Sequence, residues 1–179
     1  MKPRTRAACV HRETQEGKAS VSGGWPEAFG DLARELRADR GRPALIDASS
    51  HASGHLIDRI SPLVDEVVSL GQRIGVIDRT PTAAELVSGI SAASTLLLDI
   101  DVLFTPALRI EVMSQLRRTS QRTALIVAWP GQIAGGRLSY SLPGRADHLD
   151  EPARDLVVLR PLDTEFPDEV PYTVERYPA

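Results

Sequence analysis

Two acidic residues follow an apolar run in the middle of the chain. Residues 95–104 read TLLLDIDVLF, so Asp99 comes directly after the run and Asp101 stands two positions later. Such a run is typical of a strand buried on both faces, in a parallel sheet covered by helices. An acid at the carboxyl end of that strand stands where open α/β sheets bind ligands. We therefore predict a ligand site here, with capping of the turn at Thr105-Pro106 as the alternative role for both acids.

A loop of small residues offers the second half of such a site. It lies between a predicted strand, ALIDA at 44–48, and a predicted helix that contains HLIDRI at 55–60. The window comparable to the phosphate-binding pattern G-x-x-x-x-G-K-[ST] consists of Ser49, Ser50, His51, Ala52, Ser53, Gly54, His55 and Leu56. Only Gly54 matches, because serine, histidine and leucine replace the first glycine, the lysine and the hydroxyl residue. A plain strand-to-helix turn is the alternative.

The elements that must position these residues alternate along the chain. We predict a helix that begins at Trp25-Pro26 and ends before Gly41, and a helix that begins at Thr82. A further helix is expected from Thr105-Pro106, with Leu108, Val112, Met113 and Leu116 on its buried face. The predicted strands are 44–48, 73–78, the TLLLDID segment, 123–129 and 156–159. This order predicts a three-layer, doubly wound α/β fold with a mostly parallel five-stranded sheet.

The remaining segments complete a single-domain organisation. Residues 1–24 are polar and are predicted to be a flexible tail, followed by one α/β domain over 25–162. Within that domain, 132–150 contains Gly135-Gly136 and is predicted to be an insertion or hairpin. The proline-containing segment 163–179 is expected to be an irregular arm.

Composition limits the classes of function. The chain has 179 residues and a formal net charge of −3, so no global positive field attracts nucleic acid. One cysteine and four dispersed histidines form no zinc pattern. No apolar run approaches the length of a membrane span, and no signal-peptide core follows the basic start. We expect a cytoplasmic protein without a membrane partner.

Residues 44–161 resemble a P-loop NTPase domain of the RecA/AAA-like kind. The resemblance lies in ALIDA and SSHASGHL as strand and loop, TLLLDID as the acidic strand, and TALIVAWPG as the next strand in. More narrowly, LLLDID, IVAWPG and RLSYSLPG resemble the BrxF family of small P-loop proteins in type 3 BREX phage-defence systems. Members of that family are encoded beside a larger ATPase, a methyltransferase and a phosphatase-like protein, which are the partners that the resemblance implies.

The resemblance also implies roles for single residues. Asp99 matches the acid that holds the Mg²⁺ shell, while Ile100 stands where related ATPases often have a catalytic glutamate. Asp101 could replace that glutamate only if it shares a side with Asp99, as it would within a regular strand. Because His55 and Leu56 stand where phosphate and Mg²⁺ ligands are expected, we predict negligible intrinsic ATP turnover. Weak binding of ATP or ADP with Mg²⁺ stays open.

The sequence therefore supports three alternative functions. The first is a non-catalytic or weakly nucleotide-binding subunit of a bacterial anti-phage assembly, acting through protein partners and DNA. The second is an ATPase completed in a homo-oligomer by arginines of a neighbouring subunit. The third is a small DNA-binding protein. The residues proposed for DNA or partner contact are Arg109, Arg117, Arg118, Arg122, Arg137, Tyr140 and Arg145.

Overall fold

A helix-covered, mostly parallel sheet forms the centre of the molecule. The computed structural model describes residues 18–21, 25–75, 79, 81–162 and 172–179. The α-helices are α1 (Trp25–Ala38), α2 (Ser53–Ile60), α3 (Leu70–Gly75), α4 (Ala83–Leu86) and α5 (Val112–Ser120). Three short 3-10 helices are η1 (Ser61–Leu63), η2 (Ile100–Phe104) and η3 (Pro106–Leu108). No helix in these described ranges is long and apolar enough to cross a membrane.

Within the described residues, the main sheet contains seven strands in the order β1-β10-β9-β2-β5-β4-β3. Five of them are parallel: β9 (Leu156–Pro161), β2 (Ala44–Asp47), β5 (Ala124–Trp129), β4 (Ser94–Leu98) and β3 (Glu66–Ser69). Two antiparallel strands, β10 (Tyr172–Tyr177) and β1 (Lys18–Val21), extend the sheet beyond β9. The predicted α/β class and the mostly parallel sheet are therefore confirmed.

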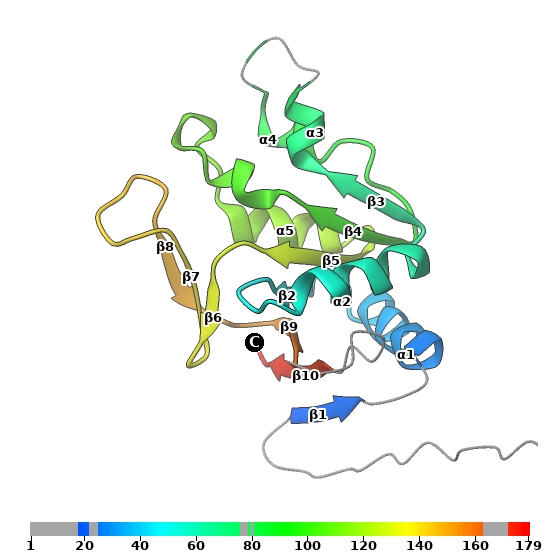
Figure 1. The fold of residues 1–179 in the computed structure, drawn as a ribbon. Helices are drawn as coiled ribbons and strands as arrows, with labels where there is room; N and C mark the ends of the chain where they lie inside the picture. The colour runs from blue at the N-terminus through cyan, green and yellow to red at the C-terminus, as the bar shows by residue number, and fades with distance from the viewer. Residues whose placement is uncertain (1–17, 22–24, 76–78, 80, 163–171) are drawn as a thin grey trace, which may run out of the picture.

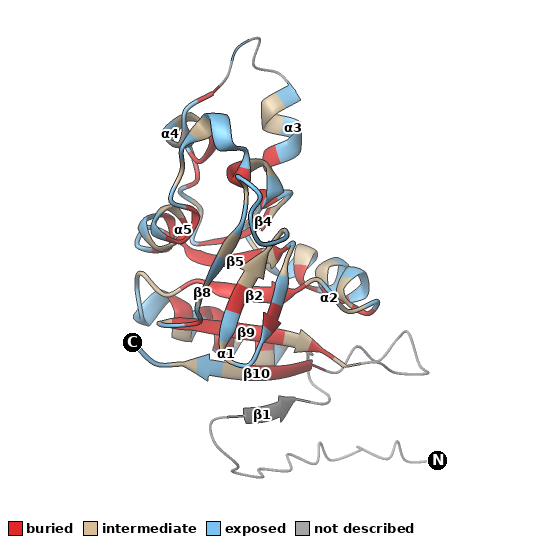
Figure 2. Cartoon of the chain, turned by 90° about the vertical axis from the view of Figure 1, so that its left-hand side faces the viewer, coloured by how far each residue is buried: buried red, intermediate tan, exposed pale blue. Residues whose placement is uncertain are grey.

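Helices cover both faces of this sheet because its strand residues alternate between two apolar cores. On β2, Ala44 and Ile46 pack in the cluster that contains Phe29 of α1 and Leu56 of α2. Leu45, between them, belongs to the cluster on the other face, which contains Met113 of α5. Figure 1 shows α2 and α5 on opposite sides of the sheet, and Figure 2 shows buried residues running along β5 and β9. The central strands are buried on both faces, as their continuous apolar sequences predict.

The predicted insertion forms a small sheet of its own. It consists of β6 (Gln132–Ala134), β7 (Arg137–Tyr140) and β8 (Leu149–Pro152), paired antiparallel in that order. Gly135 and Gly136 form the turn between β6 and β7, where both adopt positive φ. Ile133 and Leu138 fix the insertion to the α5-side core. Figure 1 shows the three strands projecting from one end of the main sheet.

One predicted strand is wrong and its replacement lies upstream. The segment predicted at 73–78 is helical over Arg73–Gly75, and 76–78 fall outside the described residues. The edge strand is instead β3, whose residues 66–69 read EVVS. Only Val68 of this strand is buried, so it lacks the long apolar run that identified the central strands.

The TLLLDID segment also ends earlier than predicted. Strand β4 stops at Leu98, Asp99 adopts a left-handed conformation with φ 55°, and η2 follows. The helix expected from Thr105-Pro106 is interrupted at Arg109, which has φ 49°, and α5 begins only at Val112. Val112, Met113 and Leu116 are buried as predicted, whereas Leu108 is only partly buried.

Both terminal segments contain strands that the sequence analysis did not predict. Residues 18–21, assigned to the flexible tail, pair with β10, and residues 172–177, assigned to the irregular arm, pair with β9. Strand β10 reads YTVERY, and its first three residues, Tyr172, Thr173 and Val174, are buried, but the surrounding prolines obscured this signal.

Candidate functional site

The predicted phosphate-binding loop lies where expected, between β2 and α2, at the carboxyl end of the central strand. Its start is held by Asp47, which is 3% exposed. The Asp47 Oδ1 atom accepts hydrogen bonds from the Ser49 backbone N–H (3.1 Å) and the Ser49 hydroxyl (2.6 Å). The loop is therefore folded onto the carboxylate that precedes it.

The other oxygen of Asp47 joins a second set of charged groups. Arg160 of β9 donates to Asp47 Oδ2 and forms an ion pair with Glu175 of β10 at 3.2 Å. Arg160 also donates to the Ile133 carbonyl of β6 (3.1 Å), and the Tyr177 hydroxyl donates to Glu175 (2.9 Å). Burial opposes charge on Arg160, but hydrogen bonds and negative charge from Glu175, with Asp47, raise the pKa of the guanidinium. This network ties β2, β9, β10 and the insertion together beside the loop.

The remaining loop residues turn mainly toward one another or toward solvent. The Ala52 N–H donates to the Ser50 hydroxyl (3.2 Å), and the Ser53 hydroxyl donates to the Ala48 carbonyl (3.4 Å). His51 and His55 are exposed. Leu56 is fully buried in the α1-side core, so the position of the Mg²⁺-binding hydroxyl in the sequence pattern offers no ligand here.

Gly54 lies in the first turn of α2 and is exposed. A Cβ built on it would meet nothing within 4 Å, and its φ is not in the positive range. The fold therefore does not require glycine at this position, although glycine within a helix is unfavourable relative to alanine.

Asp99 is turned away from the loop. Its Oδ2 accepts a hydrogen bond from the Ser69 hydroxyl at the end of β3, on the side of β4 opposite to β5 and β2. Ser69 also accepts from the Gln72 N–H (3.1 Å), and Gly71 packs so closely that an added Cβ would lie 3.3 Å from Asp99. Asp99 thus connects the ends of β4 and β3, and the expected cap of the Thr105 turn is not its role.

Asp101 does not share a side with Asp99 on a strand, because it lies in η2. It is exposed and lies near Tyr140 of the insertion, whose pKa is raised by burial and then by the negative charges of Asp101 and Asp147. No group of three or more His, Cys, Asp or Glu side chains capable of holding a metal occurs in the described part of the chain. The condition for Asp101 to replace a catalytic glutamate is not met.

The residues proposed for DNA or partner contact are not gathered into one surface by their interactions. Arg137 pairs with Asp150 (2.8 Å), Arg145 pairs with Asp147 (3.1 Å), and Arg117 donates to the Arg154 carbonyl (3.1 Å). Arg109, Arg118 and Arg122 are exposed. Tyr140 is half-buried and stacks on Phe104, with ring centroids 3.9 Å apart, so this face of its ring is already covered.

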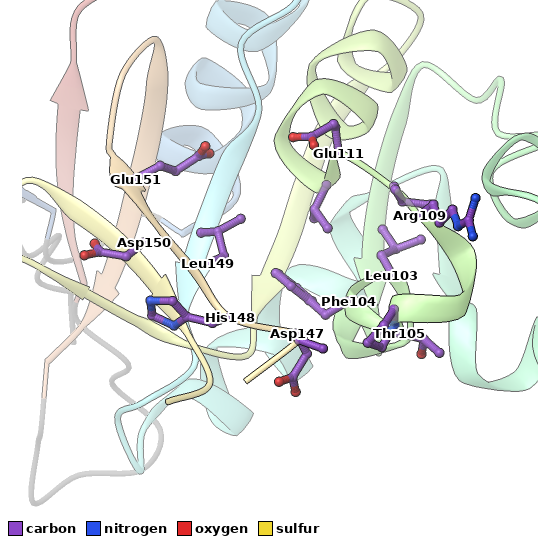
Figure 3. Close-up of a pocket in the computed structure, with 14 residues that line it drawn as sticks. Leu103, Phe104, Thr105, Arg109, Glu111, Asp147, His148, Leu149, Asp150 and Glu151 are labelled. Carbon is purple, nitrogen blue, oxygen red and sulfur yellow. The ribbon is translucent and has the colours of Figure 1, made fainter. Parts of the chain in front are cut away.

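A cavity that the sequence did not predict lies between η2, η3 and β8. It measures about 480 Å³ and is lined by two separate stretches of chain, 103–112 and 146–151. Figure 3 shows Leu103, Phe104 and Leu149 toward its interior, with acidic side chains on both walls. Of the acids that line the cavity, Asp147 and Asp150 are paired with arginines, whereas Glu111 and Glu151 have no ion pair within 4.0 Å among the described residues.

Burial affects the two unpaired acids differently. Glu151 is half-buried, its Oε1 atom has no hydrogen-bond partner among the described residues, and burial raises the pKa of its carboxyl. Arg117 lowers this pKa and Glu111 raises it, which places Glu111 close enough to act on Glu151 electrostatically. Glu111 is exposed and directly precedes α5.

The residues that sequence reasoning missed are those whose partners are distant in the chain. Arg160 and Asp47 are 113 positions apart, and Glu111 directly precedes α5 whereas Glu151 lies in β8. The only available signal was the polar end of each apolar strand: ALID ends in Asp47, and LVVL is followed by Arg160. No family model, curated protein or solved structure matches the chain.

Proposed function

We propose that the chain is a degenerate P-loop domain that serves as a non-catalytic, at most weakly nucleotide-binding, subunit of a bacterial anti-phage assembly of the BREX type. The P-loop assignment is supported by the position of the loop between β2 and α2. It is also supported by the sheet order, since β5 lies between the loop strand β2 and the acid-ended strand β4. The resemblance described for TALIVAWPG likewise predicts a strand on the inner side of the acid-ended strand.

The non-catalytic role rests on one observation: the loop residues and Asp99 are already held by contacts within the chain. Asp47 holds Ser49, Leu56 is in the core, and Asp99 bonds Ser69 on the far side of β4. Phosphoryl transfer depends on pre-positioned charges around the phosphates, and these contacts direct the available polar groups elsewhere. A domain with this loop would act through the proteins it binds.

Co-purification tests the subunit role. The tagged chain would be co-expressed with the partners that the resemblance implies, namely the larger ATPase, the methyltransferase and the phosphatase-like protein of a type 3 BREX system, with the tag alone as the control. We expect at least one of them to co-purify in comparable yield with and without added ATP and Mg²⁺, and to do so equally with the Gly54→Ala variant. If none of these three proteins co-purifies with the chain, the proposal is contradicted.

A further inference from the structure

The cavity between η2, η3 and β8 has the size and construction of a binding site. Its volume of about 480 Å³ falls within the range of small-ligand pockets. The wall formed by η2, η3 and the start of α5 and the wall that leads into β8 belong to different elements, and the cavity is distinct from the β2–α2 loop. A ligand in this cavity would therefore not occupy the predicted nucleotide site at the β2–α2 loop.

The two unpaired carboxylates face each other across this cavity. Figure 3 shows the Glu111 carboxylate pointing toward β8 and the Glu151 carboxylate pointing toward α5. The effect of Glu111 is also seen in the pKa of Glu151, which burial raises most, which Arg117 lowers and which Glu111 raises further. The buried Glu151 Oε1 atom lacks a donor among the described residues, which is unfavourable for a carboxylate oxygen removed from water.

No other charged side chain among the described residues forms an ion pair within 4.0 Å with Glu111 or Glu151. Asp147 and Asp150 already have arginine partners, and the His148 ring lies 3.2 Å from the Tyr140 carbonyl. Figure 3 shows the Arg109 guanidinium pointing away from β8 and the two glutamates. Arg117 acts on Glu151 but directs a hydrogen bond to the Arg154 carbonyl. The free charge inside the cavity is therefore acidic.

Apolar groups complete the lining. Leu103 and Phe104 are buried, while Ile110 and Leu149 are partly buried and pack against the same core. A ligand that combines an apolar stem with a planar cation satisfies both parts of this surface. An arginine side chain has this form, since its methylene stem packs on apolar groups and its five N–H donors can serve two carboxylates.

We propose that this cavity binds an arginine side chain presented by a protein partner. The inference goes beyond the proposed function, because it concerns a different site and holds whether or not the chain belongs to a defence assembly. Charge complementarity selects the partner: a basic segment whose arginine reaches between Glu111 and Glu151. Lysine fits less well, because its ammonium is a compact point charge that cannot form the planar contact with both carboxylates.

An NMR titration of the full ¹⁵N-labelled chain tests this assignment. The probe is N-acetyl-arginine amide, and the matched control is N-acetyl-citrulline amide, which has nearly the same shape without the charge. We expect saturable shifts at the amides of Phe104, Val112 and Leu149, with a millimolar dissociation constant typical of a single side chain. Glu111→Gln and Glu151→Gln should each weaken binding by about tenfold or more, and Glu27→Gln on α1 should leave it unchanged.

Several outcomes would overturn the proposal. Equal binding of the citrulline compound would show that charge is irrelevant, and shifts outside the cavity would place the site elsewhere. Tighter binding of spermidine than of the arginine probe would mean a general cation site rather than a site for protein arginine. Spectra of the two glutamine variants that overlay the wild-type spectrum away from the cavity confirm that a loss of binding is local.

Discussion

Two regions of this protein contrast in how their polar groups are used. At the β2–α2 loop, the sequence pattern suggests a ligand site, yet Asp47 is engaged by Ser49 and Arg160. At the cavity beside β8, no sequence pattern suggests a site, yet Glu111 and Glu151 lack ion-pair partners among the described residues. Motif spacing therefore predicts where a site would lie, whereas binding capacity depends on which groups the fold leaves unpaired.

The largest expected effect concerns the β2–α2 loop, where the polar groups are already paired. Replacing Asp47 by alanine leaves Arg160 with only one carboxylate and frees the Ser49 donors, in a part-buried setting. We expect the free energy of unfolding to fall by about 3 kcal/mol. Urea denaturation followed by circular dichroism measures this change, and the matched control Asp58→Ala, on the exposed side of α2, should stay within about 0.5 kcal/mol. A small effect of Asp47→Ala would show that the loop is not held by this network.

The second variant, Gly131→Ala, alters the insertion beside the cavity and leaves the β2–α2 loop intact. A Cβ on Gly131 would lie 1.8 Å from the Ser139 carbonyl oxygen, so Gly131→Ala must separate β6 from β7. We expect a loss of about 2 kcal/mol of stability and loss of binding of the arginine probe. Denaturation and the NMR titration check both effects. Retention of probe binding would mean that the pairing of β6 with β7 does not support the cavity wall at β8.

The smallest effect is a gain in stability at the loop. Because Gly54 has helical geometry and open space around it, Gly54→Ala should raise the free energy of unfolding by up to about 1 kcal/mol. The matched control is Gly89→Ala, which should be destabilising because Gly89 has φ 76°. Thermal unfolding compares the two variants. A destabilised Gly54→Ala variant would contradict the geometry described for α2.

The central fold was predictable because burial on both faces leaves continuous apolar strands. ALID, TLLL, ALIVAW and LVVL all identify strands that the structure contains. The outer strands were not predictable in the same way, because the edge strand β3 buries only Val68, and β10, next to the edge strand β1, lies among prolines. Edge strands have one neighbour and a more exposed surface, so their sequences carry a weaker pattern.

The position of the predicted site could be read from the sequence, but the hydrogen-bond and ion-pair partners of its residues could not. The loop after β2 and the acid after β4 lie at the same end of the sheet, as parallel strands require. The left-handed turn at Asp99, however, directs that acid to Ser69 of β3, and a single residue's conformation of this kind leaves no sequence signal. Likewise, Arg160 meets Asp47 and Glu175 only through strand pairing between distant segments.

The most direct test of the account is a malachite-green assay of phosphate release with the purified chain, ATP and Mg²⁺. The matched variant is Asp99→Asn, because asparagine tolerates the left-handed conformation at this position while removing the carboxylate charge. We expect phosphate release no faster than the buffer control for both proteins, because the loop and Asp99 are engaged in internal contacts. Several turnovers per minute by the wild type, abolished in Asp99→Asn, would contradict it.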